Sequence, residues 1–384
     1  MLEQIKLHNF KSHKNTQLNF DRSRLHALVG KNSSGKTSVL QALYYLSQLT
    51  NSEAKNIFHN ERAPQFITTI GQDNMSVTAS GFWGDNERQN WEASYNWQSE
   101  ATRQGIPTVL WEPDETPKFW VQSGRLRKPI FTSLSNAPKF IRESLDSAVH
   151  LNLAVTNLTK AAYSDAIKPL IEFDGSGLAP TLDYLRGEAI EQFQLLQEML
   201  KRIVPGVREI GVRRAKVTVD RQRLIEVDGK SISYVENQEI VGQEVVLNMN
   251  SGDRIPAHAI SEGTMLALGL LTVLMSPDRP NLVLLDDVEQ GLHPKAQREL
   301  IAVFKEIVQQ NNNLQIIFST HSPYIVDELT ASQVHVLSNT KSGFTRSKRL
   351  DEHPDVEWAK QTLTTGEFWD AEGEDWVLAG EIDD

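Results

Sequence analysis

The chain has 384 residues, no cysteine and a formal net charge of −11. The absence of cysteine excludes disulfides and thiolate metal sites, and the acidic balance disfavours a protein that mainly coats nucleic acid. The longest apolar stretch, residues 265–275, is shorter than the ~20 residues of a membrane helix, and the first residues lack the apolar core of a signal peptide. These features predict a cytoplasmic protein without a membrane span.

The first 50 residues predict short strands followed by a helix. Period-two patterning predicts strands at residues 4–7 and 17–20, and residues 25–29 form an apolar run that ends at Gly30. Apolar residues then recur at helical spacing over residues 38–49. The segment GKNSSGKT, residues 30–37, lies between the last strand and the helix.

This segment matches the phosphate-binding pattern G-x-x-x-x-G-K-[ST] in full, with a strand before it and a helix after it. Glycines let the backbone N–H groups point at phosphate oxygens, and the helix N-terminus adds partial positive charge. We expect Lys36 to reach the β- and γ-phosphates and Thr37 to ligate Mg²⁺. The predicted nucleotide-binding residues here are Gly30, Lys31, Asn32, Ser33, Ser34, Gly35, Lys36, Thr37 and Ser38.

The middle of the chain carries no motif of this strength. Residues 66–121 predict strands and hold five tryptophans, which fit a half-buried antiparallel sheet better than a base-stacking surface. Residues 138–204 predict helices, most clearly at 184–203, before Pro205 and Gly206 end the pattern. Residues 207–247 predict strands with a basic stretch, which is either a nucleic-acid surface or a charged edge strand.

The segment ISEGTMLALGLLTVLM, residues 260–275, predicts an apolar helix capped by Ser261. Small residues at its start leave helix N–H groups open to an anion, although an ordinary capped core helix has the same pattern. Because the phosphate loop already uses one helix N-terminus, this second one suggests that another molecule presents Ser261 and Gly263 to the same nucleotide.

Acidic residues follow the next buried strand. Residues 282–285 predict that strand, and Asp286 at its carboxyl end is the expected second magnesium ligand beside Thr37. Asp287 and Glu289 come next as candidate catalytic carboxylates. After a predicted helix at 294–309, another apolar strand at 314–319 leads to His321, which we expect to contact the γ-phosphate.

Together these motifs resemble the ABC-type P-loop ATPase superfamily, and within it the branch of SMC, RecF and OLD-like (overcoming-lysogenization-defect) proteins. In that family's order, residues 30–37 would be Walker A, 261–264 the signature, 282–287 Walker B, 291–294 the D-loop and His321 the switch histidine. The opening IKLHNFKSHKNTQLNF also resembles this branch. The resemblance covers residues 1–50 and 254–337.

The resemblance implies an α/β fold: an ABC-ATPase head with a P-loop α/β core, an N-terminal antiparallel β region and an inserted helical subdomain. The single head would comprise a Walker A lobe with a β-rich subdomain (1–137) and a helical and β insertion (138–250). A lobe with the signature, Walker B and switch histidine (251–340) and an acidic tail (341–384) would follow.

The resemblance also implies that two heads dimerise around ATP and Mg²⁺, with Ser261 of one head reaching the ATP of the other. Lys11 would touch the nucleotide from the N-terminal segment, and the Q-loop glutamine could be Gln65 or Gln72. The family usually has glutamate where this chain has Asp287. Aspartate is shorter by one C–C bond, ~1.5 Å, and a misplacement near ~1 Å can cost ~10²-fold in rate. We therefore expect slow hydrolysis, with Glu289 as a possible substitute base.

The rest of the sequence decides between kinds of ATPase. Only 63 residues follow His321, too few for a Toprim nuclease, and no long heptad array is present. Isolated heads of the resembled branch often belong to bacterial antiphage defence systems, so the resemblance implies an ATPase switch that controls a separately encoded effector, a nuclease or toxin. The alternative is a RecF-like DNA repair ATPase that binds DNA through Arg213, Arg214 and Lys216. The acidic tail, with Phe368, Trp369 and Trp376, is expected either to be solvated and anchor a partner or to fold back onto the head.

Overall fold

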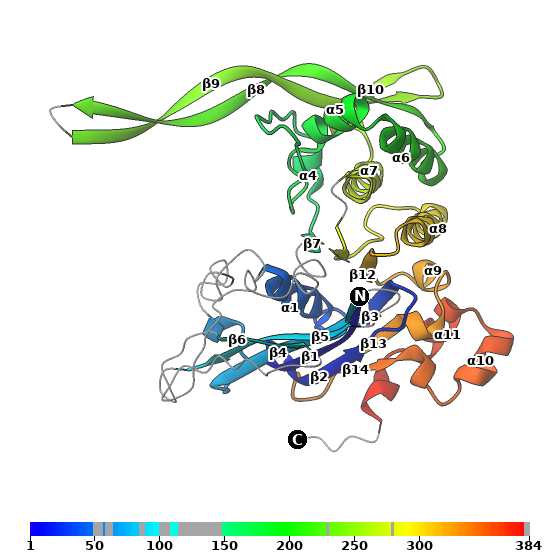
Figure 1. Ribbon diagram of the computed structural model, residues 1–384. Coiled ribbons are helices and arrows are strands. Elements are labelled where there is room, and N and C mark those ends of the chain that lie inside the picture. Colours follow the sequence, from blue (N-terminus) through cyan, green and yellow to red (C-terminus); the bar gives the residue numbers. More distant parts are fainter. Residues whose placement is uncertain are drawn as a thin grey trace. The chain divides into compact units, whose positions relative to one another are not determined.

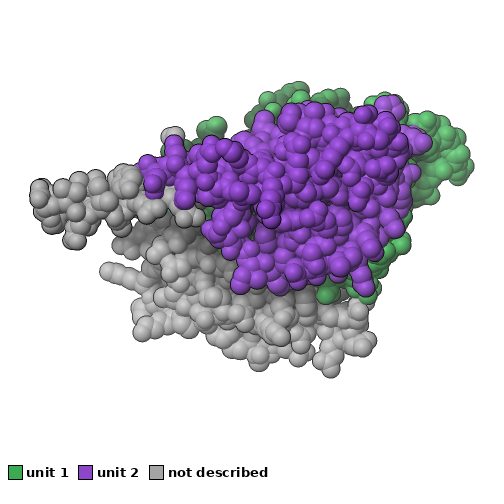
Figure 2. All heavy atoms as spheres, turned by 90° about the horizontal axis from the view of Figure 1, so that it is seen from above, with its two compact units in different colours: residues 1–150, 280–289, 301–384 green, residues 151–279, 290–300 purple. Residues whose placement is uncertain are grey.

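The computed structural model describes residues 1–48, 57, 64–83, 89–99, 108–113, 148–227, 230–277 and 280–379. The chain forms two compact units, one of residues 1–150, 280–289 and 301–384, and the other of residues 151–279 and 290–300 (Figures 1 and 2). No helix in the described ranges is long and apolar enough to cross a membrane. Both units mix helices with strands, which confirms the expected α/β class.

A six-stranded sheet forms the centre of the first unit, in the order β14-β13-β3-β12-β11-β7. Strands β13, β3, β12 and β11 run parallel, and β14 is antiparallel to β13. Strands β3, β11 and β12 are buried along their whole length, as their continuous apolar sequences predict. The bounds are β3 Leu25–Val29, β7 Ala148–Leu151, β11 Leu282–Leu285, β12 Gln315–Ser319, β13 Val334–Asn339 and β14 Thr345–Arg349.

An antiparallel sheet in the order β2-β1-β4-β5-β6 forms the second layer of this unit. Its bounds are β1 Leu2–Phe10, β2 His13–Asn19, β4 Asn74–Trp83, β5 Gln89–Gln98 and β6 Thr108–Pro113, and the short turn η2 Pro64–Phe66 precedes β4. This is the expected N-terminal antiparallel region. Trp97 is buried in it, as the half-buried-sheet interpretation predicts, whereas Trp120 lies outside the described residues.

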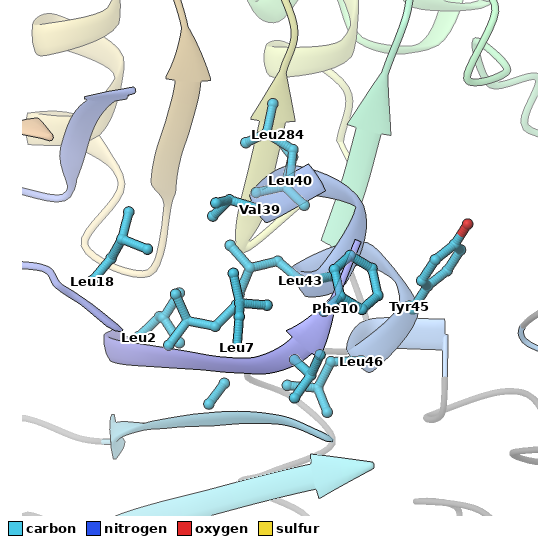
Figure 3. Packing of buried hydrophobic residues seen from close by; sticks show 14 of the residues in the cluster. Leu2, Leu7, Phe10, Leu18, Val39, Leu40, Leu43, Tyr45, Leu46 and Leu284 are labelled. Atoms are coloured by element: carbon cyan, nitrogen blue, oxygen red, sulfur yellow. The ribbon is translucent and has the colours of Figure 1, made fainter. Parts of the chain in front are cut away.

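Helix α1 (Lys36–Gln48) packs between these two sheets. One face of α1 presents Val39, Leu40 and Leu43 to the core, where they meet Leu7 and Phe10 of β1 and Leu284 of β11 (Figure 3). Because α1 begins inside the phosphate-binding pattern, this apolar packing also fixes the position of that loop.

The described part of the C-terminal segment, up to residue 379, is folded rather than solvated. After η6 (Leu350–Glu352), helices α10 (Val356–Thr362) and α11 (Thr365–Glu372) lead to the turn η7 (Asp375–Leu378). Helix α11 packs on α9 (Pro323–Val326), where the Gly366 N–H donates to Asp327 Oδ1 at 2.9 Å. Phe368 and Trp369 are buried, so the expectation that the tail is a solvated partner anchor is wrong and the fold-back alternative holds.

The second unit combines helices with a long β-hairpin. Its elements are α4 Val155–Leu158, α5 Leu178–Glu188, α6 Ile190–Ile203, β8 Val207–Val227, β9 Lys230–Met249, β10 Arg254–Pro256, η4 Ala257–Ala259 and α7 Glu262–Leu274. Helices α5 and α6 pack at one end of the twisted ribbon of β8 and β9 (Figure 1). Helix α8 (Pro294–Gln310) begins in this unit and ends in the first unit, which also contains the turn η5 (Ala331–Gln333).

Two expectations for the middle of the chain need correction. The predicted helix 184–203 is two helices, because Ala189 leaves the helical conformation with φ −137° and ψ 58°. Within the described residues, the expected helical region 138–204 also contains strand β7 and irregular segments before α5. Apolar spacing alone did not reveal this break, since Leu185 before it and Phe193 after it are both buried.

Candidate functional site

The phosphate loop, residues 30–37, leaves β3 and enters α1 through three residues with positive φ. These are Gly30 (143°), Ser33 (64°) and Gly35 (98°). Side chains from distant parts of the first unit hold its carbonyl groups. Asn339 Nδ2 donates to the Ser33 carbonyl at 2.9 Å, and Thr345 Oγ1 donates to the Ser34 carbonyl at 3.0 Å.

His13 provides the third contact to the loop. Its Nε2 atom lies 3.1 Å from the Gly35 carbonyl oxygen, which can only accept, so this nitrogen must carry the proton. Burial lowers the pKa of His13 to about 4, and the bond to Gly35 opposes that shift. His13 is therefore a neutral donor at pH 7, and it holds the loop together with Asn339 and Thr345.

Lys36 lies buried at the start of α1, beneath the loop. Its Nζ donates to the carbonyls of Gly30 at 2.9 Å and Lys31 at 3.0 Å. Burial lowers the pKa of Lys36, and the carboxylates of Asp287, Asp286, Glu289 and Glu374 oppose this shift. The ammonium group thus sits in the field of acidic side chains from two other segments of the chain.

The residues of the loop fit a magnesium–triphosphate group. Ser34 Oγ is buried without a hydrogen-bond partner among the described residues, and Lys36 uses only backbone carbonyls as partners. Asn32, Ser33 and Thr37 are exposed at the loop, and Ser38 is half-buried in the first turn of α1. Thr37 and Asp286 would hold Mg²⁺, which neutralises charge on the β- and γ-phosphates when bound.

Asp286 and Asp287 follow β11 at the carboxyl end of the parallel sheet. Ser319, the last residue of β12, connects them: its hydroxyl donates to Asp286 Oδ1, and it accepts from the Asp287 backbone N–H at 2.8 Å. Asp287 has a positive φ of 47° and is exposed, so its carboxylate is presented to solvent. The Ser319 hydroxyl also lies 3.3 Å from Asp287 Oδ1, so it contacts both carboxylates, of which Asp286 is half-buried and Asp287 is exposed.

Glu289 and His321 lie close together in the same unit. Glu289 Oε2 accepts from Thr320 Oγ1 at 2.7 Å, and its Oε1 accepts from the His321 backbone N–H at 2.7 Å. The His321 residue itself is exposed. Both Glu289 oxygens thus contact the segment that carries the expected switch histidine, His321.

The remaining predicted residues of the first unit are Lys11, which contacts α1, and the two candidate Q-loop glutamines. Lys11 has a positive φ of 51°, and its ammonium group donates to Gln41 of α1. Its backbone N–H donates to the Ile67 carbonyl at 2.7 Å. Gln65 and Gln72 are both exposed in the neighbouring segment, and neither has a contact that distinguishes it as the Q-loop glutamine.

Ser261 and Gly263 belong to the second unit. Ser261 takes the N-cap position of α7 with extended backbone, but its hydroxyl lies 2.7 Å from Thr264 Oγ1 and does not cap a backbone N–H. A Cβ on Gly263 would lie 2.2 Å from the Gly291 carbonyl oxygen. The expected signature and D-loop segments therefore meet backbone to backbone, which requires glycine at position 263.

Several residues of the site were not predicted. Ser319 and Thr320 precede His321 directly, and their polarity at the end of a buried strand was a signal that could have identified them. Asn339 and Thr345 gave no such signal, because they reach the phosphate loop only through the pairing of β13 with β3 and β14. His13 gave none either, because it depends on the contact of β2 with β14.

Comparison with known proteins identifies the family of this chain. A family described as "AAA domain, putative AbiEii toxin, Type IV TA system" matches residues 25–327. The chain belongs to this family. The match begins at β3 and runs past His321, so the matched residues include the phosphate loop, Asp286, Asp287 and His321.

Two proteins similar to this AAA-domain protein have names that describe nucleotide hydrolysis. It is 21% identical over 343 residues to the ATP/GTP phosphatase of Helicobacter pylori, covering 86% of this chain and 87% of that protein. It is 23% identical over 155 residues to the Retron Vc95 probable ATPase of Vibrio cholerae, covering 39% of this chain and only 26% of that protein. The AAA-domain protein is a P-loop ATPase.

Solved structures show the same fold. An SMC head bound to the C-winged helix domain of ScpA is 17% identical with a TM-score of 0.55, covering 91% of this chain and 99% of that one. A Smc head domain from Pyrococcus furiosus is 14% identical with a TM-score of 0.54, covering 94% and 99%. The predicted ABC-type head fold is thereby confirmed for this AAA-domain protein.

Proposed function

We propose that the protein is an ATP-dependent switch whose ATP-bound form is a homodimer that controls a separately encoded effector, a nuclease or toxin, in bacterial antiphage defence. ATP binds at the phosphate loop with Mg²⁺ held by Thr37 and Asp286, and hydrolysis is slow. The observation that carries the proposal is a convergence of three segments: the carboxylates of residues 286–289 act on Lys36 of the phosphate loop, and Glu289 among them is hydrogen-bonded to the segment that carries His321.

That convergence supplies the parts that ATP hydrolysis needs. The phosphate loop contributes the buried Lys36 ammonium group, Asp287 contributes an accessible carboxylate, and the segment after β12 contributes His321. A carboxylate that orients or deprotonates water is the usual base in such sites. Asp287, one methylene shorter than glutamate, favours long-lived ATP binding over rapid turnover.

Two features of the second unit support the proposed homodimer. Ser261 is exposed at the start of the 13-residue helix α7, whose N-terminus favours an anion. The contact of Gly263 with Gly291 ties this helix start to the expected D-loop. In a homodimer, each copy would present Ser261 to the nucleotide of the other, which gives the helix terminus an anionic partner.

The names of the relatives support a role in defence. The family description includes a putative AbiEii toxin and a Type IV TA system, and one relative is a retron ATPase. Within the described residues, the first unit is occupied by the ATPase sheets and helices. A separate effector protein is therefore the proposed recipient of the ATP signal.

Sedimentation velocity with ATP, ADP and no nucleotide tests the dimer. We expect ATP alone to convert monomer to dimer, with Lys36→Ala abolishing both ATP binding and dimerisation. Ser261→Arg should abolish dimerisation but keep ATP binding, whereas Ser251→Arg, at another exposed serine of the second unit, should do neither. A Ser261→Arg protein that dimerises normally with ATP would contradict the proposal.

The hairpin argues against direct DNA binding as the main role. Arg213 Nη2 lies 2.8 Å from Glu244, and Lys216 Nζ lies 3.0 Å from Glu239, so two of the three expected DNA-contacting cations face carboxylates of the neighbouring strand. This local neutralisation lowers the attraction of phosphate groups. Absence of an ATP-dependent mobility shift of duplex DNA at low salt is the expected result.

A further inference from the structure

Glu289 connects two segments that end at the same edge of the parallel sheet. It lies four residues beyond β11 and is half-buried. Its two carboxylate oxygens accept from two successive residues after β12, the Thr320 hydroxyl and the His321 N–H, each at 2.7 Å. One carboxylate thus holds the backbone on which His321 is carried.

The contact continues on the other side of His321. Thr320 is fully buried (0% exposed), and its Oγ1 also accepts from the Ser322 N–H at 3.1 Å. Ser322 is the N-cap residue of α9. The chain of bonds from Glu289 through Thr320 to Ser322 therefore fixes the backbone before and after His321, whose exposed side chain depends on that backbone for its position.

This arrangement differs from that of a general base. A base needs an oxygen available to the attacking water, and the exposed carboxylate of Asp287 can provide one. Glu289 instead directs both oxygens at donors of its own chain. A group held in this way acts on catalysis through the geometry of its neighbours, as outer-shell carboxylates do around catalytic histidines.

We propose that Glu289 is a positioning residue that links the carboxylate segment after β11 to the switch segment 319–322, and that it acts through the placement of His321 rather than as a substitute base. The proposal rests on the γ-phosphate role proposed for His321. The link makes the position of His321 depend on the conformation of residues 286–289, so the two sides of the site respond together to a bound nucleotide.

A glutamine variant separates positioning from base catalysis. The amide of Glu289→Gln can accept from the His321 N–H and donate to Thr320 Oγ1, because a hydroxyl also accepts. It cannot take a proton from water. We expect Glu289→Gln to keep kcat within about threefold of the wild type, whereas Glu289→Ala lowers kcat by on the order of 10²-fold with little change in the Kd for ATP.

Variants of Thr320 test the same link without changing a carboxylate. Thr320→Val removes the hydroxyl, and we expect it to lower kcat about tenfold, whereas Thr320→Ser keeps the hydroxyl and should restore near-normal kcat. Combined with Glu289→Ala, Thr320→Val should add little further loss, because both changes break one chain of contacts. ATP hydrolysis, ATP binding and far-UV circular dichroism are measured for each variant.

Two results would overturn the proposal. One is a Glu289→Gln protein as inactive as Glu289→Ala, which is the behaviour of a base. The other is a folded Thr320→Val protein with normal kcat. His321→Ala distinguishes failure of this proposal from failure of the proposed γ-phosphate role. Normal ATP hydrolysis by His321→Ala would contradict the γ-phosphate role. Slow hydrolysis by His321→Ala, with normal hydrolysis by Thr320→Val and Glu289→Ala, would contradict only the positioning role of Glu289.

Discussion

The Lys31 ammonium group lies 3.4 Å from Asp375 Oδ1, which joins the phosphate loop to the C-terminal turn η7. Glu374, a buried residue, places a second carboxylate 3.8 Å from the same ammonium group. Val377 is fully buried, and His353 packs edge-on against Trp376 at 4.8 Å, so the turn is anchored from its far side. Negative charge from the end of the chain therefore faces the loop that is expected to bind phosphate.

We predict that removing this charge strengthens ATP binding. In a Glu374→Gln, Asp375→Asn double variant, Lys31 is available to phosphate and these two carboxylates no longer repel the triphosphate. Lys31 is 69% exposed, so we expect a modest decrease in Kd of about two- to fivefold at low salt, diminishing as salt screens the charges. Isothermal titration at two salt concentrations measures the change.

Asp370→Asn is the matched control for that measurement. Asp370 is an exposed carboxylate of α11, and it shows no ion pair with the phosphate loop. We expect its Kd for ATP to equal that of the wild type. Equal affinities for the double variant and the control would show that the C-terminal carboxylates do not oppose the nucleotide.

A second prediction concerns pH and two buried histidines. His26 and His335 lie 5.6 Å apart between ring centroids, and both contact Phe20. Burial lowers the pKa of His26 to about 4, with Asp21 opposing and Arg349 adding to the shift. Burial also sets the pKa of His335 well below its usual value, and His26 and Arg349 add to this effect.

The sign of the pH dependence follows from these directions. Between the ordinary histidine pKa near 6.5 and about 4, the unfolded chain binds protons that the folded chain excludes, so the free energy of unfolding falls as pH falls. For His26 alone the loss approaches about 3 kcal/mol near pH 4. Urea unfolding at pH 7.5 and pH 5 should show the decrease, and His335→Phe should reduce it; an unchanged difference in that variant would contradict the assignment.

A third prediction concerns Gly35. A Cβ at this position would lie 2.7 Å from both His13 Nε2 and Thr345 Oγ1, the groups that hold the loop carbonyls, and φ is +98°. We expect Gly35→Ala to destabilise the protein by about 1–3 kcal/mol and to abolish ATP binding. Thermal unfolding and ATP titration measure the two effects.

Gly343→Ala provides the comparison, because Gly343 also has positive φ (+82°) but no atom within 4 Å of the added Cβ. Gly343→Ala should lower the free energy of unfolding only by the cost of a positive φ at a residue with a side chain, and it should bind ATP normally. If the two variants behaved alike, the contacts with His13 and Thr345 would not explain the requirement for glycine.

Local patterns predicted the parts of this protein that depend on neighbours in sequence. The apolar run before Gly30, the glycine pattern and the helical spacing after Lys36 together predicted β3, the phosphate loop and α1. Asp286 was likewise predictable, because a buried strand ends immediately before it. In each case the residues that determine the structure lie within about ten positions of one another.

Features set by distant contacts were not predictable in this way. The C-terminal acidic sequence is typical of a solvated tail, yet Phe368 and Trp369 are buried and α11 packs on α9. The interruption of the helical pattern at Ala189 also depends on packing, since the apolar spacing continues through it. The contacts of Glu289 with Thr320 and His321 join residues 31 and 32 positions apart, and no local pattern indicates them.

The fourth prediction concerns the length of the candidate base. Asp287 is held by its backbone N–H bond to Ser319 Oγ at 2.8 Å, so a longer side chain would extend farther from a fixed point. Because glutamate adds one methylene, we expect Asp287→Glu to raise the rate of phosphate release about tenfold in single-turnover measurements, without strengthening ATP binding.

Asp287→Asn and Asp287→Ala complete that series. Both keep the phosphate loop and Lys36 intact, so ATP should still bind, but neither offers a carboxylate to the attacking water, and phosphate release should fall by on the order of 10²-fold. In the same variants ATP should hold the proposed dimer together for longer, which sedimentation detects. Full activity in Asp287→Ala, or slower release in Asp287→Glu than in the wild type, would show that another group activates the water.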